Sequence, residues 1–132
     1  MPETNCPGIL VIDDDPAILA LVEGALEGEG YRLELIRNPL EAFRDTDPLD
    51  YDLIITDYEM KPMKGDALTM LARVAQEGRG EGTPPLPPII IMTGYRNEAR
   101  VEEWAGSDAV RQVLEKPFDL EELREAVRAA LQ

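Results

Sequence analysis

The chain has 132 residues, with 27 Asp and Glu against 13 Lys and Arg, and its formal net charge of −14 argues against non-specific binding to nucleic acid. It contains no histidine, which excludes histidine triads, histidine-ligated zinc and histidine general bases, and its single cysteine excludes an internal disulfide. Because 44% of the residues are apolar and no membrane span or signal peptide is recognisable, we expect one cytoplasmic domain over residues 1–132.

The chain opens with a predicted strand and helix. Residues 9–12 are a short β-branched run, which predicts a strand buried on both faces of a sheet. Asp15 is a suitable N-cap and Pro16 suits the first helical position, and apolar residues then recur at helical spacing. Gly28 and Gly30 are expected to end this helix.

The middle of the chain repeats this rhythm with weaker signals. Residues 33–36 favour a strand, and the arginine on each side of them indicates an edge position. A short helix is expected over 39–43, a buried strand over 53–55 and a helix over 67–75. The stretch 78–88, rich in Pro and Gly, predicts a connecting loop.

The last third completes the pattern. Residues 89–92 predict a buried strand, 99–105 a weak helix and 110–114 a weaker strand. Residues 120–131 have a clear helical pattern, with Asp119 as the N-cap. Strand and helix therefore alternate five times, which indicates an α/β protein with a mostly parallel sheet and helices on both of its faces.

Polar residues follow four of the predicted strands, at the point where each apolar run ends. They are Asp13 and Asp14, Asp57, Thr93, and Lys116. Because the carboxyl ends of parallel strands share one edge of the sheet, we expect these groups to converge there. Clustered carboxylates need a proton or a cation, and their oxygens suit Mg²⁺. A metal beside an ammonium and a hydroxyl suits a phosphoryl group, which the remaining carboxylate can accept as an aspartyl phosphate.

The ordered set of motifs resembles the receiver domains of two-component response regulators. The matching pieces are residues 9–16, Asp57-Tyr58-Glu59-Met60 with Gly65, Met92-Thr93-Gly94, and Glu115-Lys116-Pro117-Phe118. This resemblance covers almost the whole chain and implies a flavodoxin-like fold, with a five-stranded parallel sheet in the order 2-1-3-4-5 and five helices on both faces. It also implies a phosphorylation-controlled signalling switch of a phosphorelay, not a conventional enzyme.

The resemblance further implies a role for individual residues. Asp57 would accept the phosphoryl group, and Thr93 and Lys116 would contact it. The ligands of Mg²⁺, or of Mn²⁺ in its place, would be Asp13, Asp14, Asp57 and the backbone carbonyl of Glu59. The peptide bond between Lys116 and Pro117 is expected to be cis.

Partners are implied in the same way. The phosphoryl donor would be a phosphohistidine on a histidine kinase or a histidine phosphotransfer protein. A downstream protein would bind the face made by the fourth helix, fifth strand and fifth helix, without direct contact to nucleic acid or membrane. Receivers also dimerise on this face, so a phosphorylation-dependent homodimer is an option, and the chain fits both a stand-alone receiver and a piece of a larger regulator or hybrid kinase.

Two alternatives stay open. The run Asp13-Asp14-Asp15 after an apolar strand is also similar to the opening motif of haloacid-dehalogenase-type phosphatases, in which Asp13 would be the nucleophile. Against this, Ala17 stands where that motif usually has Thr or Val, and the chain is short for that fold. The second alternative is a receiver-like module that binds its partner without being phosphorylated, although all the expected site residues are present.

Overall fold

Five strands and two helices make up the described part of the chain, which covers residues 6–38, 50–57, 87–94 and 110–131 of the computed structural model. In chain order they are β1 (Gly8–Ile12), α1 (Pro16–Leu26), β2 (Arg32–Ile36), β3 (Leu53–Asp57), β4 (Ile89–Thr93), β5 (Val110–Glu115) and α5 (Leu120–Ala130). All five predicted strands are confirmed, as are the first and last helices. The predicted helices at 39–43, 67–75 and 99–105, and most of the predicted loop at 78–88, lie outside the described residues.

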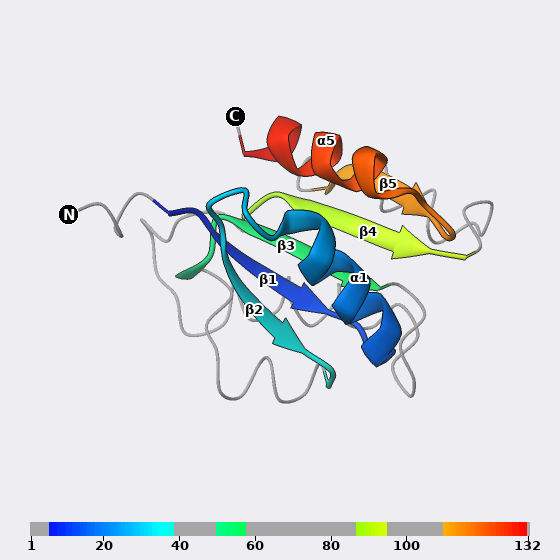
Figure 1. Cartoon of the computed structure of the whole chain (residues 1–132). Coiled ribbons are helices and arrows are strands. Elements are labelled where there is room, and N and C mark those ends of the chain that lie inside the picture. The colour runs from blue at the N-terminus through cyan, green and yellow to red at the C-terminus, as the bar shows by residue number, and fades with distance from the viewer. Residues whose placement is uncertain (1–5, 39–49, 58–86, 95–109, 132) are drawn as a thin grey trace, which may run out of the picture.

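The strands form one parallel sheet in the order β2-β1-β3-β4-β5, which confirms the predicted arrangement (Figure 1). β1, β3 and β4 lie in the middle, and all their residues are buried, which explains their apolar sequences. β2 forms one edge and is partly exposed, as its flanking arginines predicted. β5 forms the other edge, and Arg111 is an extra residue in its pairing with β4, between the partners of Ile89 and Ile90.

α1 and α5 lie side by side across the same face of the sheet (Figure 1). Alternate residues of the central strands, such as Val11 and Ile55, pack with both helices into one apolar core. Leu10, Ile12 and Ile54 are outside that core, because successive residues of a strand point to opposite faces. They are nevertheless fully buried, so the opposite face of the sheet is covered as well.

The predicted start and end of α1 are both confirmed. The side chain of Asp15 accepts a hydrogen bond from the backbone N–H of Ala17, at 2.9 Å, and Pro16 is the first helical residue. Beyond the helix, Gly28 and Gly30 adopt φ values of +83° and +90°. Side chains other than glycine rarely take this left-handed conformation, so these two residues allow the chain to turn back into β2.

α5 is an amphipathic helix whose buried face packs against the core and α1. Asp119 caps it as predicted, with Oδ1 accepting from the N–H of Glu122 at 2.7 Å. Leu123 and Val127 are fully buried against the core. Arg124 Nε donates to the carbonyl oxygen of Ala25, 2.8 Å away in the last turn of α1. Within the described residues, neither helix has the length and apolar composition needed to cross a bilayer.

Candidate functional site

The carboxyl edge of the sheet brings together four of the predicted site residues. Asp13 follows β1, Asp57 is the last residue of β3, and Lys116 follows β5. Lys116 Nζ lies 3.1 Å from Asp57 Oδ1 and 3.3 Å from Asp13 Oδ2. One carboxylate oxygen of Asp14 also lies within 4.8 Å of an oxygen of each of the other two aspartates. Residues more than one hundred positions apart in sequence thus form one compact charged cluster, because parallel strands end at the same edge.

Asp13 is held in place by its neighbours in the chain and in the sheet. Its backbone N–H donates to the carbonyl oxygen of Ile36 at the end of β2, at 3.1 Å. Its side-chain Oδ1 accepts from the backbone N–H of Asp15 at 2.8 Å, which leaves Oδ2 facing Lys116. Sequence reasoning treated Asp15 as a helix cap alone and missed this second contact. The signal was available, because Asp side chains commonly accept from the N–H two residues later.

Thr93 and Lys116 are linked through the backbone at the β4–β5 edge. Thr93 is the last residue of β4, is fully buried and pairs with Glu115 in the sheet. Its carbonyl oxygen accepts a hydrogen bond from the backbone N–H of Lys116 at 2.7 Å. Lys116, the first residue after β5, is therefore held beside Thr93. The peptide bond between Lys116 and Pro117 is cis, as predicted. Glu59, the remaining predicted site residue, lies outside the described residues.

Burial and neighbouring charges shift the pKa of Asp13 and that of Lys116 in this cluster. The Asp13 side chain has no exposed surface, and burial is the main cause that raises its pKa from 3.8 to about 6. The N–H of Asp15 opposes this rise, Asp57 adds to it and Lys116 opposes it. For Lys116, burial alone would lower the pKa, but the attraction of Asp57 and Asp13 outweighs burial and raises it. Lys116 therefore keeps its positive charge, while Asp57 and Asp13 repel each other.

The donor set of the cluster fits a hard divalent cation. Three carboxylates and one ammonium leave a surplus of two negative charges when all are ionised, the charge that one divalent ion balances. The available atoms are oxygens alone, which suits Mg²⁺ better than a soft metal. Asp14 is exposed while Asp13 and Asp57 are buried, so the cluster is reached from solvent on the Asp14 side.

Comparison with known proteins identifies the family. Residues 9–128 match the response regulator receiver domain family, so the chain belongs to this family of signalling domains. The chain is 35% identical over 126 residues to the DNA-binding dual master transcriptional regulator RpaA of Synechocystis, and 30% identical over 123 residues to the transcriptional regulatory protein ZraR of Klebsiella oxytoca. These matches cover 95% and 93% of this chain but only 49% and 26% of the two relatives. The chain thus spans about half or less of these relatives.

Solved structures agree with this assignment. The signal receiver domain of an HD domain-containing protein from Pseudomonas fluorescens Pf-5 has a TM-score of 0.76 and 28% identity, and the match covers 96% of this chain and 95% of that one. The receiver domain of the sensor histidine kinase PA1611 from Pseudomonas aeruginosa has a TM-score of 0.72 and 26% identity, covering 96% and 98%. That receiver domain has a magnesium ion coordinated in its active site cleft.

Proposed function

We propose that Asp57 accepts a phosphoryl group from a phosphohistidine of a histidine kinase or histidine phosphotransfer protein, and that this reaction requires Mg²⁺. The observation that carries the proposal is the ammonium of Lys116, which lies 3.1 Å from Asp57 Oδ1 inside a cluster of three carboxylates. An ammonium in this position attracts the oxygens of an incoming phosphoryl group.

In this proposal, a carboxylate oxygen of Asp57 forms a bond to phosphorus while the bond between phosphorus and the donor's imidazole nitrogen breaks. The electron pair of the broken bond stays on that nitrogen. Lys116 then pairs with the transferred group, and the Thr93 hydroxyl donates a hydrogen bond to one of its oxygens. When bound, Mg²⁺ would neutralise charge on the phosphoryl oxygens. Its ligands would be Asp13, Asp14, Asp57 and the backbone carbonyl of Glu59, and Mn²⁺ could take its place.

The burial of the two inner carboxylates favours Asp57 over Asp13 as the nucleophile. Asp13 has no exposed side-chain surface. The Asp57 side chain keeps 6% of its surface exposed. A donor can reach Asp57 more directly, which argues for the receiver reaction and against the phosphatase reaction that uses Asp13.

Signal output follows from the same contacts. Phosphorylation of Asp57 adds charge beside Lys116, whose backbone N–H is bonded to Thr93 at the end of β4. A change at this point is transmitted to β5, and we infer that the face of the fourth helix, β5 and α5 binds a downstream protein or a second copy of the chain. Residues 1–132 would act as one receiver domain in the cytoplasm, alone or within a longer regulator or kinase.

Mass spectrometry of the intact protein tests the proposal. Incubation with acetyl phosphate and Mg²⁺ is expected to add one labile phosphoryl group, which is lost in Asp57→Asn and in the presence of EDTA. Asp50→Asn is the matched control, because Asp50 is an exposed aspartate near the opposite end of β3 and should leave the adduct unchanged.

Two results would contradict this assignment. An adduct that survives in Asp57→Asn but disappears in Asp13→Asn would support the phosphatase reaction instead. A correctly folded wild-type protein that forms no adduct with acetyl phosphate, and none with a phosphorylated histidine phosphotransfer protein, would support a binding module that works without phosphorylation.

A further inference from the structure

The outer surface of α1 is unusually apolar for a helix at the surface of a protein. Its sequence contains one charged residue, Glu23, whereas α5 carries charges along its exposed side. Ala17, Ala20, Leu21 and Gly24 of α1 are all exposed. An exposed helix surface with so few charges is normally covered by another part of its own protein or by a partner. The outward surface of α1 is therefore suited to contact with another protein.

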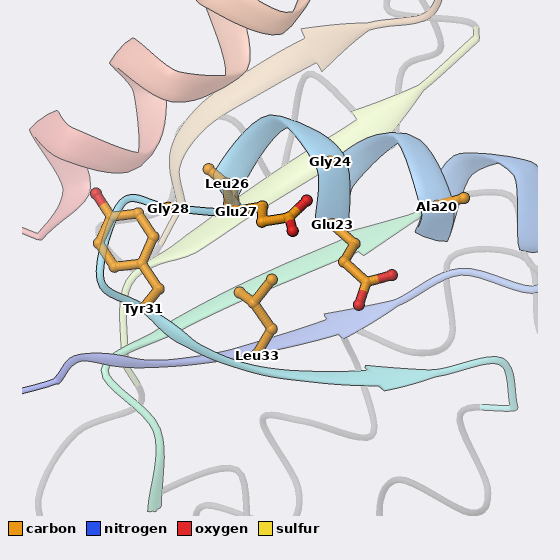
Figure 2. Close-up of a pocket in the computed structure, with 8 residues that line it drawn as sticks. All are labelled: Ala20, Glu23, Gly24, Leu26, Glu27, Gly28, Tyr31 and Leu33. Carbon is orange, nitrogen blue, oxygen red and sulfur yellow. The ribbon is translucent and has the colours of Figure 1, made fainter. Parts of the chain in front are cut away.

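A groove of about 610 Å³ lies beside this surface, between α1 and β2 (Figure 2). Leu26 and Leu33 contribute apolar side chains to it, and the ring of Tyr31 lies at one end. The carboxylate of Glu23 in α1 and that of Glu27, the C-cap residue, also line the groove (Figure 2). The groove thus combines two carboxylates with a few apolar side chains in a mostly polar lining. It lies toward the end of α1, away from the aspartate cluster at the start of the helix.

Gly24 opens the groove at a position where the fold does not require glycine. It lies inside α1, where glycine is less favourable than alanine because it loses more backbone freedom. A Cβ atom added at Gly24 would meet no atom within 4 Å, and no positive φ is recorded for this residue. Neither packing nor backbone conformation within the described residues explains the missing side chain, so the space that it leaves is available to an external group.

The two glutamates of the groove stand at positions where their charges destabilise α1. Glu23 and Glu27 lie in the last turn and at the C-cap, where the partial negative charge of the helix end disfavours carboxylates. Glu29, a short distance further on, is paired with Arg128 at 3.6 Å. Among the residues that the structure describes, no cation pairs with Glu23 or Glu27. Two local choices that weaken the helix therefore face the same groove, and such conflicts are typical of functional surfaces.

We propose that this groove binds a basic segment of a protein partner, with Lys or Arg side chains seated between Glu23 and Glu27 and small apolar side chains packed over Gly24. The charge of the groove selects a cationic partner and excludes a nucleic acid. The apolar side chain of Leu33 and the adjoining uncharged surface of α1 favour a polypeptide over a free cation. The interaction goes beyond phosphoryl transfer and does not depend on it.

The first test is the binding of a probe peptide to the full chain. The probe is a labelled helical peptide of about 15 residues with Lys and Ala or Leu on one face, which is long enough for measurable helix formation. A peptide with Glu in place of Lys is the negative probe. Binding is measured by fluorescence anisotropy, and its location by amide chemical-shift changes, with the isolated signals of Gly24 and Gly28 as local reporters.

Three variants separate charge from shape. Glu23→Gln with Glu27→Gln should weaken binding of the Lys peptide about fivefold, the effect typical of losing two exposed ion pairs. The matched control, Glu122→Gln with Glu125→Gln, removes the same charge from exposed positions on α5 and should change binding much less. Gly24→Gln fills the groove without changing the net charge of −14, and it should also weaken binding.

The results decide the proposal in either direction. Larger losses in the groove variants than in the α5 control, with shift changes concentrated at α1 and β2, would support it. Equal losses in both charge variants, or shift changes spread over the whole acidic surface, would overturn it, because non-specific attraction would then explain the binding. Tight binding by Gly24→Gln, or no binding of the Lys peptide to the wild type, would overturn it as well.

Discussion

Replacing Asp13 with asparagine should stabilise the metal-free protein at neutral pH, although it should abolish metal binding. Burial, helped by Asp57, raises the pKa of Asp13 from 3.8 to about 6. This rise means that ionised Asp13 lowers the free energy of unfolding by roughly 3 kcal/mol at pH 7, relative to a carboxylate with its usual pKa.

The asparagine variant should recover part of that energy. Its Oδ1 can still accept from the N–H of Asp15, but its amide N–H₂ would face the ammonium of Lys116, 3.3 Å from the present Oδ2. Losing this attraction offsets some of the gain, so we expect the free energy of unfolding to increase by about 1–2 kcal/mol at pH 7. Asp13 should contribute its full stability below pH 3.8, where it is protonated in both states, and lose it as the pH rises through about 6.

Urea unfolding in EDTA between pH 4 and 8 measures this difference. The gain of Asp13→Asn over the wild type should be largest near pH 7 and should shrink toward pH 4, while Asp50→Asn serves as an exposed control. Added Mg²⁺ should stabilise the wild type and not the variant. A variant that is less stable than the wild type at pH 7 in EDTA would refute the reasoning, as would a gain that does not change with pH.

Three further predictions concern the metal, α1 and α5. Mg²⁺ affinity, measured by calorimetry, should fall as the pH drops below about 6, because Asp13 must lose its proton to bind the ion; a flat profile between pH 5 and 7 would contradict this. Gly24→Ala should raise the free energy of unfolding by about 1 kcal/mol, since the added Cβ meets no atom; destabilisation in a urea titration would show a hidden clash. Asp119→Ala should lower the free energy of unfolding by about 1 kcal/mol, because it removes the N-cap of α5. Asp119→Asn should keep most of the stability that the cap provides.

Much of the fold follows from short-range patterns in the sequence. The strands were recognisable because β1, β3 and β4 are buried on both faces and therefore tolerate only apolar residues along most of their length. The predicted carboxyl end of β1 is correct, but those of β3 and β4 fall too early, since β3 continues through Thr56 and Asp57 and β4 through Thr93. Backbone pairing does not require an apolar side chain, and the pairing of Thr56 with Ile12 extends β3 beyond its hydrophobic run.

The site could be predicted in outline but not in its detail. Topology alone explains why Asp13, Asp57 and Lys116 meet, because parallel strands share a carboxyl edge. The raised pKa of Asp13 depends on complete burial, which no local pattern reveals. The extra residue Arg111 in the β4–β5 pairing and the groove between α1 and β2 are likewise products of packing. These features arise only once the strands and helices have packed together.

The electrostatics of the cluster explain how a single modification could act as a switch. The metal-free site is destabilised by its own carboxylates, and Lys116 divides its attraction between Asp57 and Asp13. In the reaction proposed above, conversion of Asp57 to an acyl phosphate would move its negative charge outward and draw the ammonium of Lys116 after it, which would weaken the contact with Asp13. The backbone N–H of Lys116 donates to the carbonyl oxygen of Thr93, so a displacement that reaches the backbone of the lysine would also reach the end of β4. In this proposal, a displacement of Lys116 would reach the edge strand β5, which is partly exposed.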